Sequence, residues 1–139
     1  MSETSGDPTP LHQLLQVQTT LPGDGTATAV LPHGEYVRGW VSPLHGGIIA
    51  TIADIVCAAT LVGRFEPPAE VPVSTDLHVR YYRTPKQWPV TAVGRLVHAG
   101  KTLLGTECVI SDAAGNELAR ASATYVIVRG FNDGARPPS

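Results

Sequence analysis

The pattern of hydrophobic and polar positions divides the chain into a helical first half and a strand-rich second half. Between residues 44 and 63 the sequence LHGGIIATIADIVCAATLVG is apolar on every side of a helix, which predicts one long, fully buried helix over about 46–62. From Val71 onward the hydrophobic period changes to two, which predicts a half-buried strand that ends before Pro85. Further strands follow at 90–98, 102–111 and 117–129.

Shorter elements precede the long helix. Leucines at helical spacing over 11–18 predict a short amphipathic helix, and 26–31 and 36–41 predict two short strands. The loop 112–115 predicts a hairpin with Gly115 at positive φ. We therefore expect an N-terminal tail and short helix over 1–25, one α+β domain over 26–130 with strands around a central helix, and a flexible tail over 131–139.

Composition limits the classes of function. The chain has 139 residues, and its net charge of −2 gives no support for a nucleic-acid-binding surface. Gly46, Gly47, two threonines and Asp54 argue against a membrane span over 44–63. Cys57 and Cys108 lie in apolar runs without a CxxC motif, which is typical of small core residues in a reducing cytosol. With no secretory signal in view, we expect a cytoplasmic protein.

Asp54 is the only formal charge between residues 44 and 63. Burial of a carboxylate costs free energy and raises its pKa unless donors pair with it, so a desolvated Asp54 points to chemistry. The alternative is an exposed helix residue paired with a base, although no Arg or Lys lies within one turn. The sequence His45-Gly46-Gly47 opens the same helix, whose first N–H groups are unpaired and carry the positive end of the helix dipole.

The order of elements and the motif HGGIIATIAD resemble the hotdog-fold acyl-CoA thioesterases, specifically the phenylacetyl- and 4-hydroxybenzoyl-CoA (PaaI-like) type. The resemblance covers residues 26–129, and VSTDLHVRYYRTP is similar to the strand after the family's helix. It implies an antiparallel sheet wrapped around one helix and a homo-oligomer, either a dimer or a homotetramer. It also implies an enzyme that hydrolyses thioesters of coenzyme A with small, medium or aromatic acyl groups.

The resemblance also implies roles for single residues. Asp54 occupies the position of the catalytic carboxylate, acting as general base or as nucleophile through a mixed anhydride. Gly46 occupies the position whose N–H polarises the thioester carbonyl, and Gly47 adjoins it in the substrate-binding turn. Ser74 matches a polar residue that helps to position water across the dimer interface. Many members carry Asn or Gln six residues before the motif His, where this chain has Gly39.

Each of these residues also has a structural interpretation. His45 is a candidate acid, but a role in capping or bracing the loop is favoured. Gly46-Gly47 can serve tight packing at a turn, and Ser74 can be a surface residue in a polar patch with Asp76 and His78 on its face. Arg83 and Lys101 are candidates to hold the phosphates of coenzyme A, although ordinary surface charge explains each alone. The histidines lack metal-ligand spacing, so we expect no metal and no cofactor.

Spacing along the helix bears on how the site is built. Asp54 lies eight residues after Gly46, which is roughly 12 Å of rise in an α-helix and too far for both to reach one carbonyl. Either Gly46 lies in the approach loop and the helix begins later, or a partner helix supplies one of the two groups. We take the spacing as support for a site shared across a dimer.

Two other functions compete with hydrolysis. A non-catalytic acyl-CoA-binding module is favoured by Gly39 and opposed by the retained Asp54. A hotdog dehydratase or hydratase usually pairs its acid with a nearby His, and no His follows Asp54 within the helix.

Overall fold

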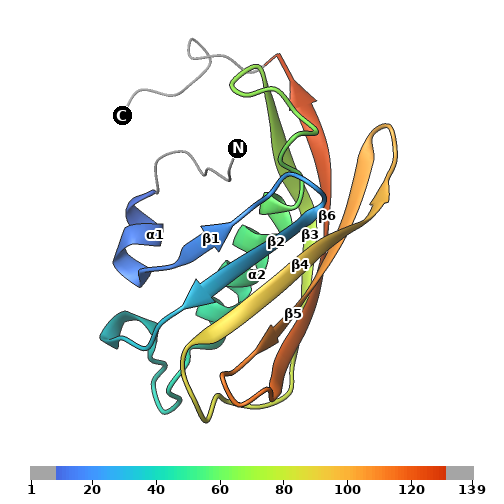
Figure 1. Cartoon of the computed structure of the whole chain (residues 1–139). Helices are drawn as coiled ribbons and strands as arrows, with labels where there is room; N and C mark the ends of the chain where they lie inside the picture. Colours follow the sequence, from blue (N-terminus) through green and yellow to red (C-terminus); the bar gives the residue numbers. More distant parts are fainter. Residues whose placement is uncertain (1–8, 131–139) are drawn as a thin grey trace.

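The computed structural model describes residues 9–130. In these residues one six-stranded antiparallel sheet curls around a single long helix, with a short N-terminal helix at one edge (Figure 1). This is the α+β hotdog architecture that the sequence predicts. The elements are α1 (Pro10–Leu15), β1 (Gln18–Thr20), β2 (Thr26–Leu31), the 3-10 helix η1 (Glu35–Val37), α2 (Gly46–Ala59), β3 (Glu70–Tyr81), β4 (Val90–Ala99), β5 (Leu103–Ser111) and β6 (Glu117–Arg129).

The strands pair in the order β1-β2-β4-β5-β6-β3, so β1 and β3 are the two sheet edges. The predicted hairpin between β5 and β6 is confirmed, with Gly115 at φ 90°. The expected end of the first helix and the expected start of the sheet, both near the N-terminus, need correction. The first helix ends at Leu15, and the chain then forms β1, which pairs with β2 and extends the sheet. The expected tail over 131–139 lies outside the described residues.

The core lies between α2 and the concave face of the sheet. Five residues of α2 are almost completely buried: Ile49, Ile52, Ala53, Val56 and Cys57. Gly94 on β4 allows the helix to lie close, because a Cβ there would stand only 3.3 Å from Val56 and Thr60. Cys57 and Cys108 are both buried free thiols, as their apolar surroundings predict.

The expectation that α2 is buried on every side is wrong. One face remains open between the two sheet edges, and on it Gly47 and Asp54 are exposed and Thr51 is half-buried. The physical reason is that one sheet curls around part of a helix and cannot close over all of it. We call this surface of α2, centred on Thr51 and Asp54, the open face.

The segment 36–41 is not a strand. Glu35–Val37 forms the helix η1, and the following loop exposes Trp40 and Val41 almost completely, at 98% and 93% of their surface. The expected strand is short, and within residues 9–130 it pairs with none of the six strands of the sheet. The loop folds on itself instead, with the Gly39 N–H donating to the Ser42 carbonyl at 2.8 Å.

A β-bulge in β3 changes which residues share a face. Ser74 pairs with Tyr125, but the next pairing is Asp76 with Thr124, so Thr75 is an extra residue. Tyr125 is buried toward α2, and directly opposite residues point to the same side of a sheet. Ser74 therefore lies on the helix side, whereas Asp76 and His78 lie on the outer side. The expected patch of Ser74, Asp76 and His78 on one face does not form.

Candidate active site

Hydrogen bonds at the start of α2 leave one backbone N–H without an acceptor. His45 is the N-cap, and its Nδ1 accepts the Gly47 N–H at 2.8 Å. The His45 N–H donates to the Val37 carbonyl, and the N–H groups of Ile48 and Ile49 donate to the His45 carbonyl. Among the donors at 45–49, only the Gly46 N–H has no acceptor within the described residues. The Gly46 N–H is thus the backbone donor at this helix terminus that can bind an anion or a carbonyl oxygen.

Two glycines at this terminus differ in what they allow. A Cβ on Gly47 would stand 3.1 Å from the His45 ring, so Gly47 makes room for the cap. A Cβ on Gly46 would make ordinary contact with the Tyr81 ring, at 3.5 Å. The Tyr81 hydroxyl donates to the Gly46 carbonyl at 2.9 Å and so ties β3 to the first residue of α2.

Asp54 lies on the open face and is exposed, so the expectation of a desolvated carboxylate is wrong for the single chain. Its partner is a hydroxyl rather than a base, because the Tyr125 hydroxyl donates to Asp54 Oδ1 at 2.7 Å and to the Asp54 carbonyl at 3.2 Å. Burial, with a further contribution from the hydrogen bond to Asp54, raises the pKa of Tyr125 well above its usual value. Tyr125 therefore stays protonated and orients the carboxylate.

Tyr125 is a site residue that the sequence analysis missed. It occupies a buried position of β6 between two half-buried ones, a pattern that indicates only a core residue. The available signal was its hydroxyl, since a buried Tyr usually finds a hydrogen-bond partner. Ser74 stands beside Tyr125 in the sheet, so β3, β6 and α2 bring Ser74, Tyr125 and Asp54 to one region.

A model of the thioesterase superfamily matches residues 43–119, which is more than half of the chain and includes the start of α2, Asp54 and Ser74. The chain belongs to the thioesterase superfamily. Thioester hydrolysis is accordingly its class of reaction. A comparison with curated proteins found no significant match.

Solved structures agree with the hotdog fold of this thioesterase. A thioesterase from Staphylococcus aureus is similar with a TM-score of 0.80 and 18% identity over 86% of this chain and 98% of that chain. A protein from Bacillus halodurans, solved with CoA, has a TM-score of 0.77 and 26% identity over 90% and 82%. A thioesterase from Haemophilus influenzae has a TM-score of 0.76 and 16% identity over 95% and 97%.

The two basic residues expected to hold phosphates do not lie together in the thioesterase. The Arg83 N–H donates to the Leu118 carbonyl near the start of β6, whereas Lys101 precedes Leu103, which pairs with Val126. Leu118 and Val126 lie eight positions apart along β6, which corresponds to roughly 26 Å. Within one chain Arg83 and Lys101 therefore serve different surfaces.

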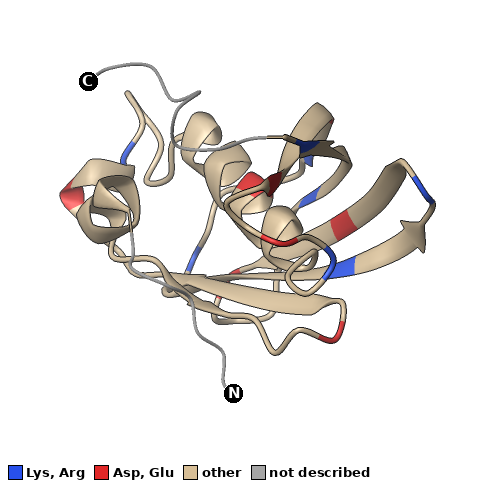
Figure 2. Ribbon diagram, turned by 90° about the horizontal axis from the view of Figure 1, so that it is seen from above, with Lys and Arg blue, Asp and Glu red and all other residues tan. Residues whose placement is uncertain are grey.

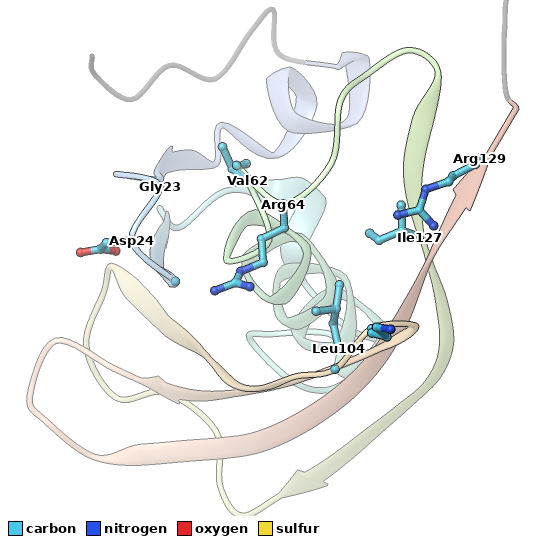
Figure 3. Close-up of a pocket in the computed structure, with 11 residues that line it drawn as sticks. Gly23, Asp24, Val62, Arg64, Leu104, Ile127 and Arg129 are labelled. Carbon is cyan, nitrogen blue, oxygen red and sulfur yellow. The ribbon is translucent and has the colours of Figure 1, made fainter.

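Lys101 instead lines a basic pocket of about 420 Å³ at the far end of the sheet, together with Arg64 and Arg129. Arg64 and Arg129 reach into this pocket from two sides (Figure 3). Arg129 is paired with Glu70 at 2.8 Å, while the described residues provide no ion pair for Arg64 or Lys101. Asp24, which also lines the pocket, accepts hydrogen bonds from the Thr26 N–H and hydroxyl through its Oδ1.

Elsewhere in residues 9–130, charged residues of both signs lie among one another over the ribbon (Figure 2). Two ion pairs join neighbouring strands, Arg95 with Glu107 and Arg129 with Glu70, and a third, Arg120 with Glu117, lies within β6. Residues 9–130 contain no cluster of three or more potential metal ligands. No helix in the same residues is long and apolar enough to cross a membrane.

Proposed function

We propose that this thioesterase hydrolyses acyl-CoA at a site shared by two copies of the chain. The observation that carries the proposal is the open face of α2, with an unpaired Gly46 N–H at its start and an exposed, Tyr125-bound Asp54 eight residues later. The Gly46 N–H polarises the thioester carbonyl, because a helix N-terminus stabilises the developing oxyanion. Asp54 then acts as general base on water or as nucleophile through a mixed anhydride.

The length of the helix supports a shared site. Because α2 begins at Gly46, both groups belong to one continuous helix and stand roughly 12 Å apart along it. The first way to close the gap, a helix that begins after Gly46, is therefore removed. Two α2 helices packed antiparallel across their open faces would place Gly46 of one copy near Asp54 of the other. Gly47, which has no side chain, permits such an approach on that face.

A second copy is also supported by the edge strand β3. This strand is 12 residues long and has one unpaired edge, and Leu77 and Tyr81 on its helix side are 36% and 52% exposed. A long exposed edge with apolar side chains favours pairing with another strand. Pairing of β3 with its copy would cover this edge and continue the sheet, giving a dimer; two such dimers would form the tetramer implied by the family resemblance.

The other site residues take supporting roles. His45 caps α2 and thereby fixes the Gly46 N–H, while Gly47 gives the cap its space. Ser74, beside Tyr125, helps to position water near Asp54. Lys101, with Arg64, binds phosphate groups of the carrier, which is consistent with the CoA in the Bacillus halodurans relative. Arg83 contributes to carrier binding from the other end of the sheet.

The HGG-x6-D motif supports the phenylacetyl- and 4-hydroxybenzoyl-CoA (PaaI-like) type, with a small, medium or aromatic acyl group. The buried free thiols Cys57 and Cys108 support a reducing, cytoplasmic location.

A non-catalytic acyl-CoA-binding protein is the second candidate, and Gly39 is the observation that favours it. A Cβ at this position would lie 3.4 Å from the His45 Cα, directly beside the candidate site. An amide side chain that many relatives carry at this place is therefore missing next to the Gly46 donor.

Hydrolysis by the wild type separates the two candidates, and the variant Asp54→Asn tests the role of the carboxylate. We expect it to fold normally and bind acyl-CoA, but to lose about 10²–10⁴ of kcat, because the base or nucleophile is gone. Asp76→Asn, which removes the same charge on the outer side of β3, is the matched control and should keep its kcat. Hydrolysis of a panel of acyl-CoAs is followed with a thiol reagent. An unchanged kcat in Asp54→Asn removes Asp54 from the mechanism, and a wild-type protein that binds but never hydrolyses is a binding module.

A further inference from the structure

A groove of about 530 Å³ continues the open face of α2 past Asp54 toward the C-terminal end of the helix. Ala58, one turn after Asp54, lines it. On β3 it reaches Pro72, which lies two residues before Ser74 and on the same side of the sheet. The groove is mostly apolar, with walls from Val17, Leu21, Ile55, Ala58, Phe65 and Pro72.

One polar atom in this groove lacks a partner. Thr19 lines the groove and pairs in the sheet with Ala29, which is buried against the helix, so the Thr19 side chain points inward. Its Oγ1 is buried, and it is the only such side-chain nitrogen or oxygen in residues 9–130 without a hydrogen-bond partner. His12, which also lines the groove, already forms a hydrogen bond through its Nδ1 with Thr9 Oγ1 at 2.6 Å.

A buried hydroxyl without a partner costs free energy, so an unpaired one in a groove points to a polar group on a ligand. A volume of about 530 Å³ with apolar walls and one such group is typical of a small-molecule site. The groove begins within one helical turn of Asp54, where the acyl side of a thioester must leave the reacting carbonyl. Its place and its chemistry therefore suit the acyl part of the substrate.

We propose that the groove binds the acyl group of the substrate and that Thr19 Oγ1 hydrogen-bonds to a hydroxyl or keto group on that acyl group. The inference rests on the proposed thioesterase site and adds its substrate class, which is an apolar acyl thioester of medium length carrying one polar substituent. Acetyl thioesters are too short to enter the groove. Unsubstituted medium chains enter it but leave the Thr19 hydroxyl unpaired.

Two variants and one matched control test this class of substrate. Ala58→Leu places a larger side chain in the groove, and Thr19→Val removes the hydroxyl while keeping the shape of the side chain. Thr20→Val is the control, because Thr20 pairs with Thr28 on the outer side of the same strand. The substrates are acetyl-CoA, octanoyl-CoA and hydroxyoctanoyl-CoAs with the hydroxyl at carbons 3 to 8. Circular dichroism confirms that each variant is folded.

We expect Ala58→Leu to lower kcat/KM for octanoyl-CoA at least about tenfold while that for acetyl-CoA stays within about twofold. The wild type should prefer at least one hydroxyoctanoyl-CoA to octanoyl-CoA by about three- to tenfold, the worth of one hydrogen bond. Thr19→Val should abolish this preference, and Thr20→Val should keep it.

Other outcomes overturn the inference without touching the reaction. If Ala58→Leu slows acetyl-CoA and octanoyl-CoA equally, the groove does not hold the acyl group. If Ala58→Leu changes only the sedimentation of the protein, a second copy occupies the groove. A wild type that prefers octanoyl-CoA to every hydroxylated chain refutes the role of Thr19.

Failure of the proposed function gives a different result, in which the wild type hydrolyses no thioester. The groove is then tested by calorimetric titration with octanoate and 8-hydroxyoctanoate. Binding that Ala58→Leu weakens, with tighter binding of the hydroxylated acid in the wild type, supports the groove as a site for such acids. Absence of binding overturns it.

Discussion

At the scale of single residues, the first turn of α2 shows why a helix start can be both capped and reactive. The His45 side chain satisfies the Gly47 N–H and leaves the Gly46 N–H for another acceptor. The Gly46 carbonyl, in turn, is held by the Tyr81 hydroxyl. The position of one backbone donor is therefore fixed from both sides, which is the preorganisation that an oxyanion site requires.

Substitutions at residues 45 and 46 should separate capping from catalysis. Gly46→Ala should fold, because its methyl group meets Tyr81 at an ordinary contact distance of 3.5 Å. The methyl group stands where the substrate should lie, so the loss in kcat should approach the 10²–10³ typical of one oxyanion donor. His45→Ala should lower the free energy of unfolding by about 1 kcal/mol through loss of the cap and slow turnover less.

The two variants are compared by kcat at equal folded fraction, measured by circular dichroism. Wild-type turnover in Gly46→Ala together with an inactive His45→Ala would refute the oxyanion assignment and give His45 a chemical role.

At the scale of elements, the loop between β5 and β6 is organised by one buried carboxylate. Asp112 is 5% exposed and accepts the backbone N–H groups of Lys86, Ala114 and Asn116. These hydrogen bonds lower the pKa of Asp112 to about 2, and the bond from the Lys86 N–H contributes most. They join the β3–β4 connection to the β5–β6 hairpin, so this carboxylate holds two loops in register.

The lowered pKa of Asp112 predicts how stability depends on pH. Because the pKa is below its value in the unfolded chain, the carboxylate stabilises the fold above about pH 4. This contribution is lost as the pH falls from about 4 through 2, where the unfolded chain binds the proton more readily. Urea unfolding at steps from pH 5 to 2 should show a shallower fall for Asp112→Asn than for the wild type. Parallel curves for the two proteins would contradict this account.

At the scale of the whole molecule, one sheet and one helix leave an edge and a helix face uncovered. The unpaired edge of β3 and the open face of α2 lie next to each other, and both Asp54 and Leu77 belong to this region. The surface that a dimer would bury is thus the surface on which the proposed site lies, so assembly and activity should be lost together.

Leu77→Asp should break the proposed dimer. Leu77 pairs with Ala123 on the helix side of β3, and a charge there cannot be buried against a second copy without a large cost. We expect a folded monomer with little hydrolysis. Val93→Asp, on a central strand where the native side chain is 52% exposed, is the control and should keep the dimer. Sedimentation velocity at micromolar concentration measures both. A wild-type protein that is itself a stable monomer would refute the dimer and the shared site.

Particular residues show how far the sequence leads and where it stops. His45-Gly46-Gly47 predicted the start of α2, and period-two alternation predicted β3 through β6 with small errors at their ends. Both patterns depend on local backbone geometry, which neighbouring residues largely determine. The bulge at Thr75 could not be predicted, because one inserted residue depends on the pairing with β6. It reversed the faces of Asp76 and His78 relative to Ser74.

The sequence by itself determined the class of fold, the position of the central helix and the presence of an acid and an unpaired donor on it. Only the tertiary structure decided that Asp54 is exposed and held by Tyr125, that Arg83 and Lys101 lie at opposite ends of β6, and that Thr19 faces a groove. Periodicity reports which side of an element is apolar. How much of that side is covered, and by which distant residue, depends on the width and curl of the sheet.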